Sequence, residues 1–319
     1  MKRTVIILGC LVALLSGCKE VVHFNIDERA YVLVLNSILH ADSDSIRIDL
    51  TRTKFPDEST KWPAFPDAEV QIYEDGNLIG RAEWSDRGYF LYPYRVLPGH
   101  IYRITAQTDG YPKVWGETTV PEFLQECKIE LQHKETDQQR FYLADYRWQD
   151  KPGKRNFYWF GAQYSSGSPE LPYPMEDTVN LDNVSFFVSK STLPDPFNRV
   201  FVGGSDPEYE YYIRVEDSGL DGKSLNLFYR FNSMPAMKAR VYILNTDTHY
   251  DAYLKSVMEN YENSVSLDDF PLIYHPAYVH TNIQGGTGLV GSYTSAEQIL
   301  NIPLKNENTD FYPPSAGLE

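Results

Sequence analysis

Cysteine is scarce in this sequence of 319 residues, which has three cysteines, two of them within the first 18 residues. Cys127 is therefore the single thiol of the remaining chain, so we expect no structural disulfide and a fold stabilised by its hydrophobic core. Basic residues are also few, because 29 Lys and Arg stand against 44 Asp and Glu and leave a formal net charge of −15. Phosphate backbones are bound by basic patches, which this sequence lacks, so we expect no nucleic-acid partner.

The sequence also lacks the short motifs of common enzymes and metal sites. It contains no G-x-S-x-G, H-E-x-x-H or C-x-x-C pattern. We therefore predict a protein without enzymatic activity, with no catalytic residue, no metal site and no cofactor. A hydrolase remains a weaker alternative, because a glycosidase needs only two facing carboxylates, which 44 acidic residues could supply.

Residues 286–291 spell the dinucleotide-binding pattern G-x-G-x-x-G. That pattern functions at the start of a helix, whose N-terminus faces the pyrophosphate. Here the chain continues with Ser292-Tyr293-Thr294-Ser295 and reaches a proline at position 303. We expect a tight turn between two strands instead, in which glycine tolerates the required backbone.

Two further patterns resemble metal sites and have simpler explanations. His275 and His280 lie five residues apart in an extended segment, so their side chains should point to opposite faces and should not share a metal ion. Asp42 and Asp44 lack the ligand spacing of a calcium loop, and so does the segment 217–222. We interpret both acidic segments as ordinary turns.

Long apolar runs are missing except near the N-terminus, where residues 5–15 follow Lys2 and Arg3. This run is too short to span a bilayer and is typical of a cleaved signal peptide. The tetrapeptide Leu15-Ser16-Gly17-Cys18 resembles the bacterial lipobox, whose cysteine is acylated, for example with palmitate, and becomes the new N-terminus. We therefore expect a signal peptide over 1–17, a lipidated Cys18 and a tether over 18–29. The alternative is an ordinary signal peptide that happens to contain a cysteine.

The two residues after this cysteine indicate a destination. Lys19-Glu20 resembles the short Lys-acidic signals that direct lipoproteins of Bacteroidota to the outer cell surface. We therefore expect a lipoprotein of the outer membrane that is anchored through lipidated Cys18 and faces the cell exterior. Stable anchoring of this kind needs more than one acyl chain.

The segment 30–122 has the pattern of a β-sandwich. Residues 45–50 alternate between apolar and polar side chains, as a strand with one solvated face requires. Residues 70–73 and 78–80 flank an Asp-Gly turn and predict a hairpin. Further strands are predicted at 31–35, 89–92, 101–106 and 113–118. The segments 66–73, 86–89 and 98–102 resemble an immunoglobulin-like or prealbumin-like module, so we predict that fold for this domain.

The segment 123–319 predicts a second β-rich domain. Strands are expected at 141–148, 156–162, 183–188, 211–215, 225–230 and 239–244. One amphipathic helix is expected near 248–262, because apolar residues recur there at helical spacing. Thr248 with Asp251 three residues later predicts its start. The chain as a whole is therefore expected to be mainly β.

Three segments of the C-terminal half resemble a known family. They are Asp221-Gly222-Lys223, residues 250–256 on the expected helix, and residues 281–288 with their glycines. In this order, and together with the lipobox, they are similar to the Bacteroidota lipoproteins grouped as domain-of-unknown-function family 4249. Members are often encoded near TonB-dependent outer-membrane transporters. The resemblance implies an accessory role in cargo capture or gating and identifies no site residue.

These observations together predict a non-catalytic protein that binds a ligand for a TonB-dependent transporter or caps it. Candidate ligand contacts are aromatic residues in loop-like segments, namely Trp62, Phe65, Tyr164 and Tyr173. Exposed aromatic side chains suit binding surfaces, although each of these could equally pack locally. The main alternative is a structural or adhesive surface protein in which sandwich domains act as spacers.

Overall fold

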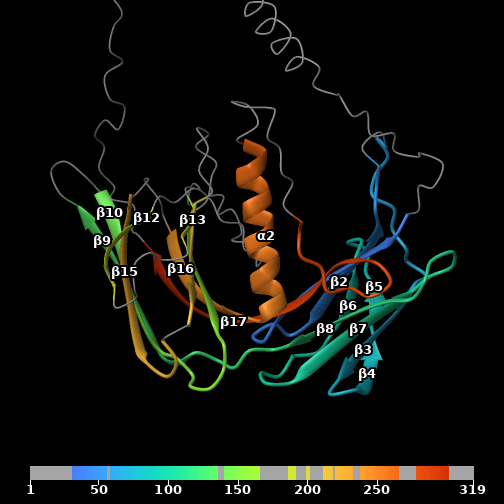
Figure 1. Ribbon diagram of the computed structural model, residues 1–319, viewed down its shortest axis with the longest axis horizontal. Coiled ribbons are helices and arrows are strands. Elements are labelled where there is room, and N and C mark those ends of the chain that lie inside the picture. The colour runs from blue at the N-terminus through green and yellow to red at the C-terminus, as the bar shows by residue number, and fades with distance from the viewer. Residues whose placement is uncertain are drawn as a thin grey trace, which may run out of the picture. The chain divides into compact units, whose positions relative to one another are not determined.

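The computed structural model describes residues 31–55, 58–135, 140–165, 186–191, 199–201, 211–217, 220–232, 238–265 and 278–301 (Figure 1). The expected signal peptide, Cys18 and the tether lie outside these residues. The chain divides into two compact units, residues 1–31 and 32–319, and the elements below all belong to the second. Within the described part of the chain, no helix is both long enough and apolar enough to cross a membrane.

The described residues are mainly β, as predicted. The first half contains β1 (Leu33–His40), β2 (Ile46–Arg52), β3 (Glu69–Glu74), β4 (Asn77–Arg81), β5 (Glu83–Trp84), β6 (Phe90–Tyr92), β7 (Ile101–Gln107) and β8 (Val114–Thr119). The second half contains β9 (Gln125–Glu135), β10 (Arg140–Gln149), β11 (Phe157–Ser165), β12 (Phe186–Ser191), β13 (Arg199–Phe201), β14 (Tyr211–Glu216), β15 (Ser224–Asn232), β16 (Lys238–Thr246), α2 (Thr248–Val265) and β17 (Thr287–Asn301).

One sheet runs through both halves of the chain. Its strand order is β13-β14-β11-β16-β17-β1-β2-β6-β5. At its centre, β1 pairs in parallel with β17, from Val34 opposite Thr287 to His40 opposite Tyr293. Two four-stranded sheets complete the fold, in the orders β4-β3-β7-β8 and β12-β15-β10-β9.

The first hydrophobic core lies between β1, β2 and the sheet β4-β3-β7-β8. The predicted alternation in β2 is confirmed, because Ile46, Ile48 and Leu50 are buried while Arg47 is exposed. The predicted hairpin is present as β3 and β4, and its turn residues Asp75 and Gly76 both have positive φ, as the tight Asp-Gly turn requires. This half therefore has the two-layered packing expected of a sandwich.

A second core belongs to the other half of the chain. Tyr146 and Trp148 of β10 pack with Phe160 of β11, Leu227 of β15 and Ile243 of β16. The boundary at residue 122 stays a prediction, because Ile283 and Val290 from beyond it belong to the first core and one sheet contains strands from both sides. Strand β9, which begins at Gln125, was not anticipated by the sequence pattern.

The glycine segment 286–291 is not the tight turn that the sequence suggested. Most of it belongs to strand β17. Its glycines are needed because the backbone of β17 passes very close to the backbone of β1. A Cβ on Gly286 would lie 2.4 Å from the carbonyl oxygen of Leu33, and one on Gly288 would lie 2.3 Å from that of Leu35. Glycine at these positions therefore lets β17 lie directly against β1, and a strand rather than a nucleotide-binding helix follows.

Helix α2 begins at Thr248, and its cap lies one residue before the expected Thr248 cap. The carboxylate of Asp247 accepts hydrogen bonds from the backbone nitrogens of His249 (3.1 Å) and Tyr250 (2.9 Å), so Asp247 is the N-cap. It also accepts one from the backbone nitrogen of Ser292 in β17 (3.0 Å). The cap therefore fixes both the start of the helix and its position on the central sheet.

Candidate functional site

A pocket of about 290 Å³ opens where β1 ends and the chain turns into β2. Its walls come from the β1–β2 turn, β16 and β17, which are neighbours because β17 pairs with β1 on one side and with β16 on the other. The register places His40 opposite Tyr293 and Leu244 opposite Ser295. The lining residues are His40, Asp42, Ser43, Asp44, Arg240, Tyr242, Leu244, Tyr293 and Ser295.

Histidine, serine and aspartate meet in this pocket. Nε2 of His40 lies 3.0 Å from Oγ of Ser295 and 3.6 Å from Oδ2 of Asp42, so both groups lie at the same ring nitrogen. The His40 ring stacks on Tyr293 at 4.4 Å between centroids, which fixes its orientation.

The charges of the pocket are mixed. The carboxylates of Asp42 and Asp44 are 50 % and 86 % exposed, and Asp44 forms an ion pair with Arg95. Nε of Arg240 donates to the carboxylate of Glu297 at 2.6 Å. The pocket therefore offers carboxylate acceptors, a guanidinium and hydroxyl groups within a small volume. This set suits hydrogen bonding to a polar ligand.

Asp42 and Asp44 were expected to form an ordinary acidic turn. The structure places them in that turn and also in the wall of the pocket. Sequence reasoning missed the pocket, since its other walls come from residues about 200 and 250 positions further along the chain.

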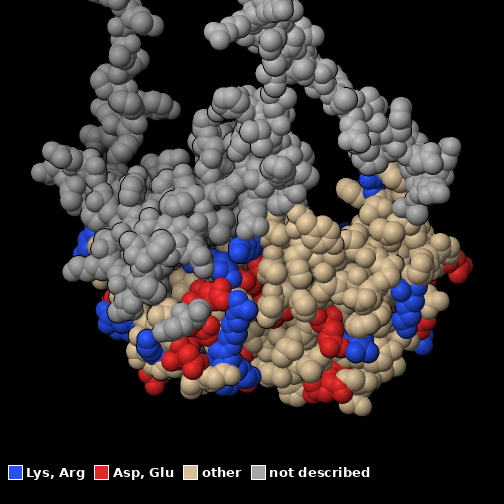
Figure 2. Space-filling view, in the orientation of Figure 1, with Lys and Arg blue, Asp and Glu red and all other residues tan. Residues whose placement is uncertain are grey.

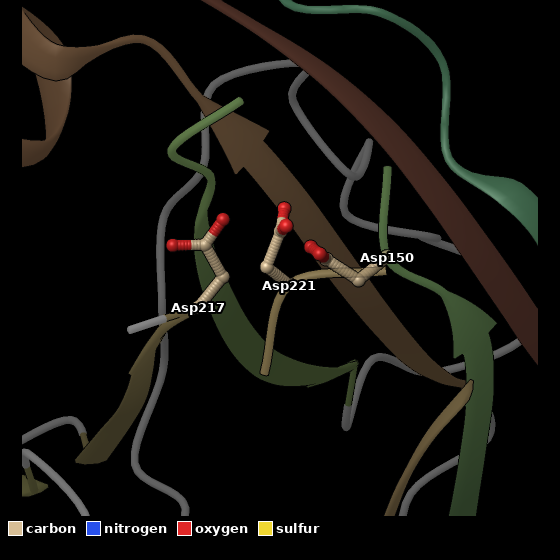
Figure 3. Close-up of side chains that lie close together, drawn as sticks. All are labelled: Asp150, Asp217 and Asp221. Carbon is tan, nitrogen blue, oxygen red and sulfur yellow. The ribbon is translucent and has the colours of Figure 1, made fainter. Parts of the chain in front are cut away.

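Three aspartates gather at a second place, where the loop after β10 meets the loop after β14 (Figure 3). One carboxylate oxygen from each of Asp150, Asp217 and Asp221 lies within 4.8 Å of the others. Burial raises the pKa of Asp217, and the nearby carboxylates of Asp150 and Asp221 raise it further. Oxygen ligands of this kind could hold a calcium ion.

Backbone groups already bind these carboxylates. Asp150 accepts a hydrogen bond from the nitrogen of Gly222 (2.8 Å), and Asp221 accepts one from the nitrogen of Gly153 (2.7 Å). Asp217 accepts one from the nitrogen of Asn156 (2.8 Å). These bonds tie the two loops together. Asp217 and Asp221 of the expected acidic turn thus lie close to the distant Asp150, while residues 218 and 219 lie outside the described part of the chain.

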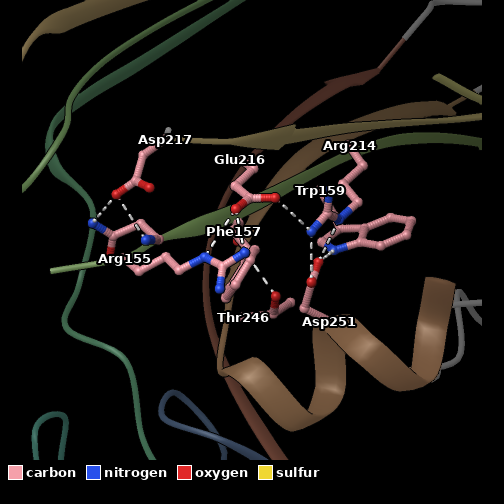
Figure 4. A network of polar contacts seen from close by, with 9 residues as sticks. Arg155, Phe157, Trp159, Arg214, Glu216, Asp217, Thr246 and Asp251 are labelled. Carbon is pink, nitrogen blue, oxygen red and sulfur yellow. Dashed lines mark hydrogen bonds and ion pairs between the residues drawn. The ribbon is translucent and has the colours of Figure 1, made fainter. Parts of the chain in front are cut away.

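A buried ion pair joins the helix to the sheet (Figure 4). Arg214 of β14 donates from Nε and Nη2 to the two carboxylate oxygens of Asp251, each at 2.7 Å, and Nε1 of Trp159 donates to the same carboxylate at 2.9 Å. Arg214 also reaches Glu216 at 3.5 Å, and Glu216 pairs with Arg155. This network positions α2 against β11 and β14, and we interpret it as structural.

His280 contacts a different histidine from the one that the sequence suggested. His275 lies outside the described residues, whereas Nε2 of His280 lies 3.2 Å from Nδ1 of His249 on α2. The two rings are stacked at 14° with centroids 5.4 Å apart. Burial and the neighbouring His249 lower the pKa of His280 below its ordinary value.

Of the four aromatic residues predicted to contact a ligand, only Trp62 and Phe65 have side chains in the described part of the chain. Trp62 is 63 % exposed, and Nζ of Lys54 lies 5.0 Å from its ring centroid. Phe65 packs against the first core, edge-on to Tyr111. Tyr164 belongs to β11, and its side chain lies outside the described part, as does the whole of Tyr173. Their role in binding stays a prediction.

Figure 2 shows Lys and Arg next to Asp and Glu in several places, beside a broad area that has neither. Opposite charges form ion pairs on the protein surface, as with Arg103 and Glu117 or Arg47 and Asp49.

The sequence matches the model of one protein family, which is described as a domain of unknown function (DUF4249), over residues 19–299. No similar protein was found among curated proteins.

Solved structures show only weak similarity. The major pilin SpaD from Corynebacterium diphtheriae aligns at 14% identity over 70% of this chain and 62% of its own, with a TM-score of 0.23. A glycosyl hydrolase family 2 member from Bacteroides cellulosilyticus aligns at 8% identity over 69% of this chain and 27% of its own, with a TM-score of 0.20. The collagen adhesin from S. aureus aligns at 7% identity over 86% of this chain and 95% of its own, with a TM-score of 0.20. The chain thus spans less than two thirds of the pilin and of the hydrolase, and TM-scores this low carry no argument about function.

Proposed function

This chain belongs to the family described as a domain of unknown function, DUF4249, and we propose that it is a non-catalytic binding protein for a small, neutral, hydroxylated ligand of the saccharide class. The observation that carries the proposal is the pocket at the end of β1, with its converging polar side chains. Binding sites are usually concave and hold a few well-placed polar groups that orient the ligand.

The size of the pocket limits the ligand. Its volume of about 290 Å³ lies just below the range of about 300–1,000 Å³ that is typical of small-molecule sites. One or two sugar rings are therefore a better match than a large cofactor or a protein segment. Leu244 and the rings of Tyr242 and Tyr293 supply an apolar part of the wall, which suits the C–H face of a sugar.

The charge of the pocket limits the ligand further. Arg240 is bound to Glu297, so its positive charge is compensated, whereas Asp42 adds negative charge at the opening. An anionic ligand would be repelled by this carboxylate. A neutral hydroxylated molecule can donate hydrogen bonds to Asp42 and accept them from Arg240 and Ser295.

The sequence also favours binding over catalysis, because it contains none of the common catalytic motifs G-x-S-x-G, H-E-x-x-H and C-x-x-C. We therefore propose that the ligand leaves the pocket chemically unchanged.

The proposal includes a place for the protein. The lipobox-like tetrapeptide ending at Cys18 and the family resemblance support a lipid-anchored protein of the outer membrane that faces the exterior. In this position it would serve as an accessory of a TonB-dependent transporter, which it supplies with the bound ligand or caps.

Two experiments test these parts separately. The purified lipidated protein is screened against a panel of neutral, acidic and amino saccharides by saturation-transfer NMR, and the same samples are followed for new products. We expect saturation transfer to a neutral saccharide and no product. Saturation transfer only to anionic compounds, or to none of the panel, would contradict the proposed ligand, and product formation would make the protein an enzyme.

The second experiment tests the partner. Tagged protein is recovered from outer membranes in mild detergent, with a Cys18→Ala variant as control, and its companions are identified by mass spectrometry. Stoichiometric recovery of a TonB-dependent barrel that is lost in the control is the expected result. Recovery of the lipoprotein alone would refute a stable transporter complex, and self-assembly would favour the adhesive alternative.

A further inference from the structure

We propose that His249 and His280 form a binding site for a divalent transition-metal ion such as Zn²⁺, Ni²⁺ or Cu²⁺. His249 is the second residue of α2, and His280 belongs to the segment that leads toward β17. Nδ1 of His249 and Nε2 of His280 lie 3.2 Å apart, although 31 residues separate them in the sequence.

This separation is close to what two ligands of one metal ion require. Imidazole nitrogens bind Zn²⁺ at about 2.0–2.1 Å, so two of them at a tetrahedral angle lie roughly 3.4 Å apart. The observed distance therefore differs by a few tenths of an ångström. A neutral N–H···N hydrogen bond also fits this distance. Metal titration of histidine variants distinguishes a hydrogen bond from a metal site.

Both histidines are held by their backbones. The nitrogen of His249 donates to the Asp247 carboxylate at 3.1 Å, so the residue sits in a capped first turn. The nitrogen of His280 donates to Oγ of Ser256 at 2.8 Å, and this hydroxyl donates to the carbonyl of Tyr253 at 2.8 Å. The two imidazoles thus project from fixed points, which reduces the entropy lost when they bind one ion.

The electrostatics suit a cation. The carboxylate of Asp247 accepts a hydrogen bond from the backbone nitrogen of His249, so it lies close to the histidine pair. Its oxygens accept backbone hydrogen bonds, so it would favour a cation as a neighbouring charge rather than as a ligand.

The pair leaves room for further ligands. Both side chains are half-buried, so solvent can reach the ion. Within the described residues, the only group of three or more His, Cys, Asp or Glu with metal-ligand spacing is the aspartate cluster, so water would complete the coordination here. We therefore expect weaker binding than at a structural zinc site with four protein ligands, and a partly open coordination sphere.

The test uses the full-length lipidated protein in detergent, purified with a tag that contains no histidine. Zn²⁺ binding is measured by titration calorimetry at pH 7.5 for the wild type, His249→Gln and His280→Gln. A matched control is His100→Gln, because His100 is also a partly exposed histidine but pairs with Asp75 on another part of the sheet system. We expect one ion per wild-type chain, at least a tenfold weaker affinity in either variant of the pair, and no change in the control.

A second readout does not depend on how the variants fold. The electron paramagnetic resonance spectrum of the wild-type Cu²⁺ complex should show hyperfine coupling to two imidazole nitrogens. A spectrum without nitrogen coupling, or equal Zn²⁺ affinity in the wild type and in both variants of the pair, would overturn the proposal and leave the contact as a hydrogen bond.

Discussion

Removing the carboxylate of Asp251 should destabilise the protein strongly. In the Asp251→Ala variant, the guanidinium of Arg214 would remain buried, since Arg214 is 3 % exposed and Asp251 is 4 % exposed. Two charge-assisted hydrogen bonds of 2.7 Å and the bond from Trp159 would be lost together. Breaking one partner of a buried ion pair costs about 3–5 kcal/mol, and we expect a loss of that size in the free energy of unfolding.

The matched control is an exposed pair with the same two donor atoms and similar distances. Arg103 donates from Nε and Nη2 to the carboxylate of Glu117 at 2.9 and 2.7 Å, but these side chains are 46 % and 40 % exposed. Water and salt screen such pairs, so Glu117→Ala should cost about 0–1 kcal/mol. Burial is thus the main difference between the two perturbations.

Urea denaturation at pH 7, followed by tryptophan fluorescence, gives the free energy of unfolding of the wild type and of both variants. A third variant, Asp251→Asn, keeps an oxygen for the indole of Trp159 and removes the negative charge, so its cost should reflect an Arg214 charge left with the more distant Glu216 alone. Suppose that Asp251→Ala lowered the free energy of unfolding no more than Glu117→Ala does, and that the slope of this free energy with urea concentration were unchanged. The reasoning from burial would then be refuted.

Three further predictions follow from pKa shifts. Burial raises the pKa of the Cys127 thiol from 9.0 to about 11, so alkylation at pH 8 should be about 100-fold slower in the folded protein than in urea, and equal rates would contradict this. The Arg52 guanidinium lowers the pKa of Glu58 from 4.5 to about 2, so the ionised Glu58 stabilises the wild type. The wild type should therefore be more stable than Glu58→Gln above pH 4.5, and this difference should vanish as the pH falls toward 2. Urea denaturation across that pH range measures the difference. Burial raises the pKa of Asp247, so the ionised form costs stability. Asp247→Asn should therefore gain stability relative to the wild type as the pH rises above the ordinary pKa of 3.8, and a difference that stays constant would contradict the assignment.

Much of the strand pattern could be predicted from local sequence. The alternation of Ile46, Ile48 and Leu50 identified β2 because a strand with one buried face requires period two. The Asp-Gly dipeptide identified the β3–β4 turn because its two residues tolerate positive φ. In each case the signal and the structure concern neighbouring residues.

The parts that could not be predicted depend on contacts between distant residues. The parallel pairing of β1 with β17 joins residues about 250 positions apart. The glycines of β17 were predicted to form a turn, because no pattern in the neighbouring sequence indicates their close approach to Leu33 and Leu35. The contact of His280 with His249 and the gathering of the pocket residues have the same origin. The candidate site therefore appears only in the folded chain.

The measurement that tests the proposed binding function most directly is the affinity of the saccharide selected by NMR for three proteins. These are the wild type, Asp42→Asn at the pocket opening, and Asp109→Asn, which changes an exposed aspartate in another turn. A hydrogen bond to a charged group contributes about 1.5–3 kcal/mol, so the account predicts a loss of at least about tenfold for Asp42→Asn and none for Asp109→Asn. Equal affinity in all three proteins would contradict binding in this pocket.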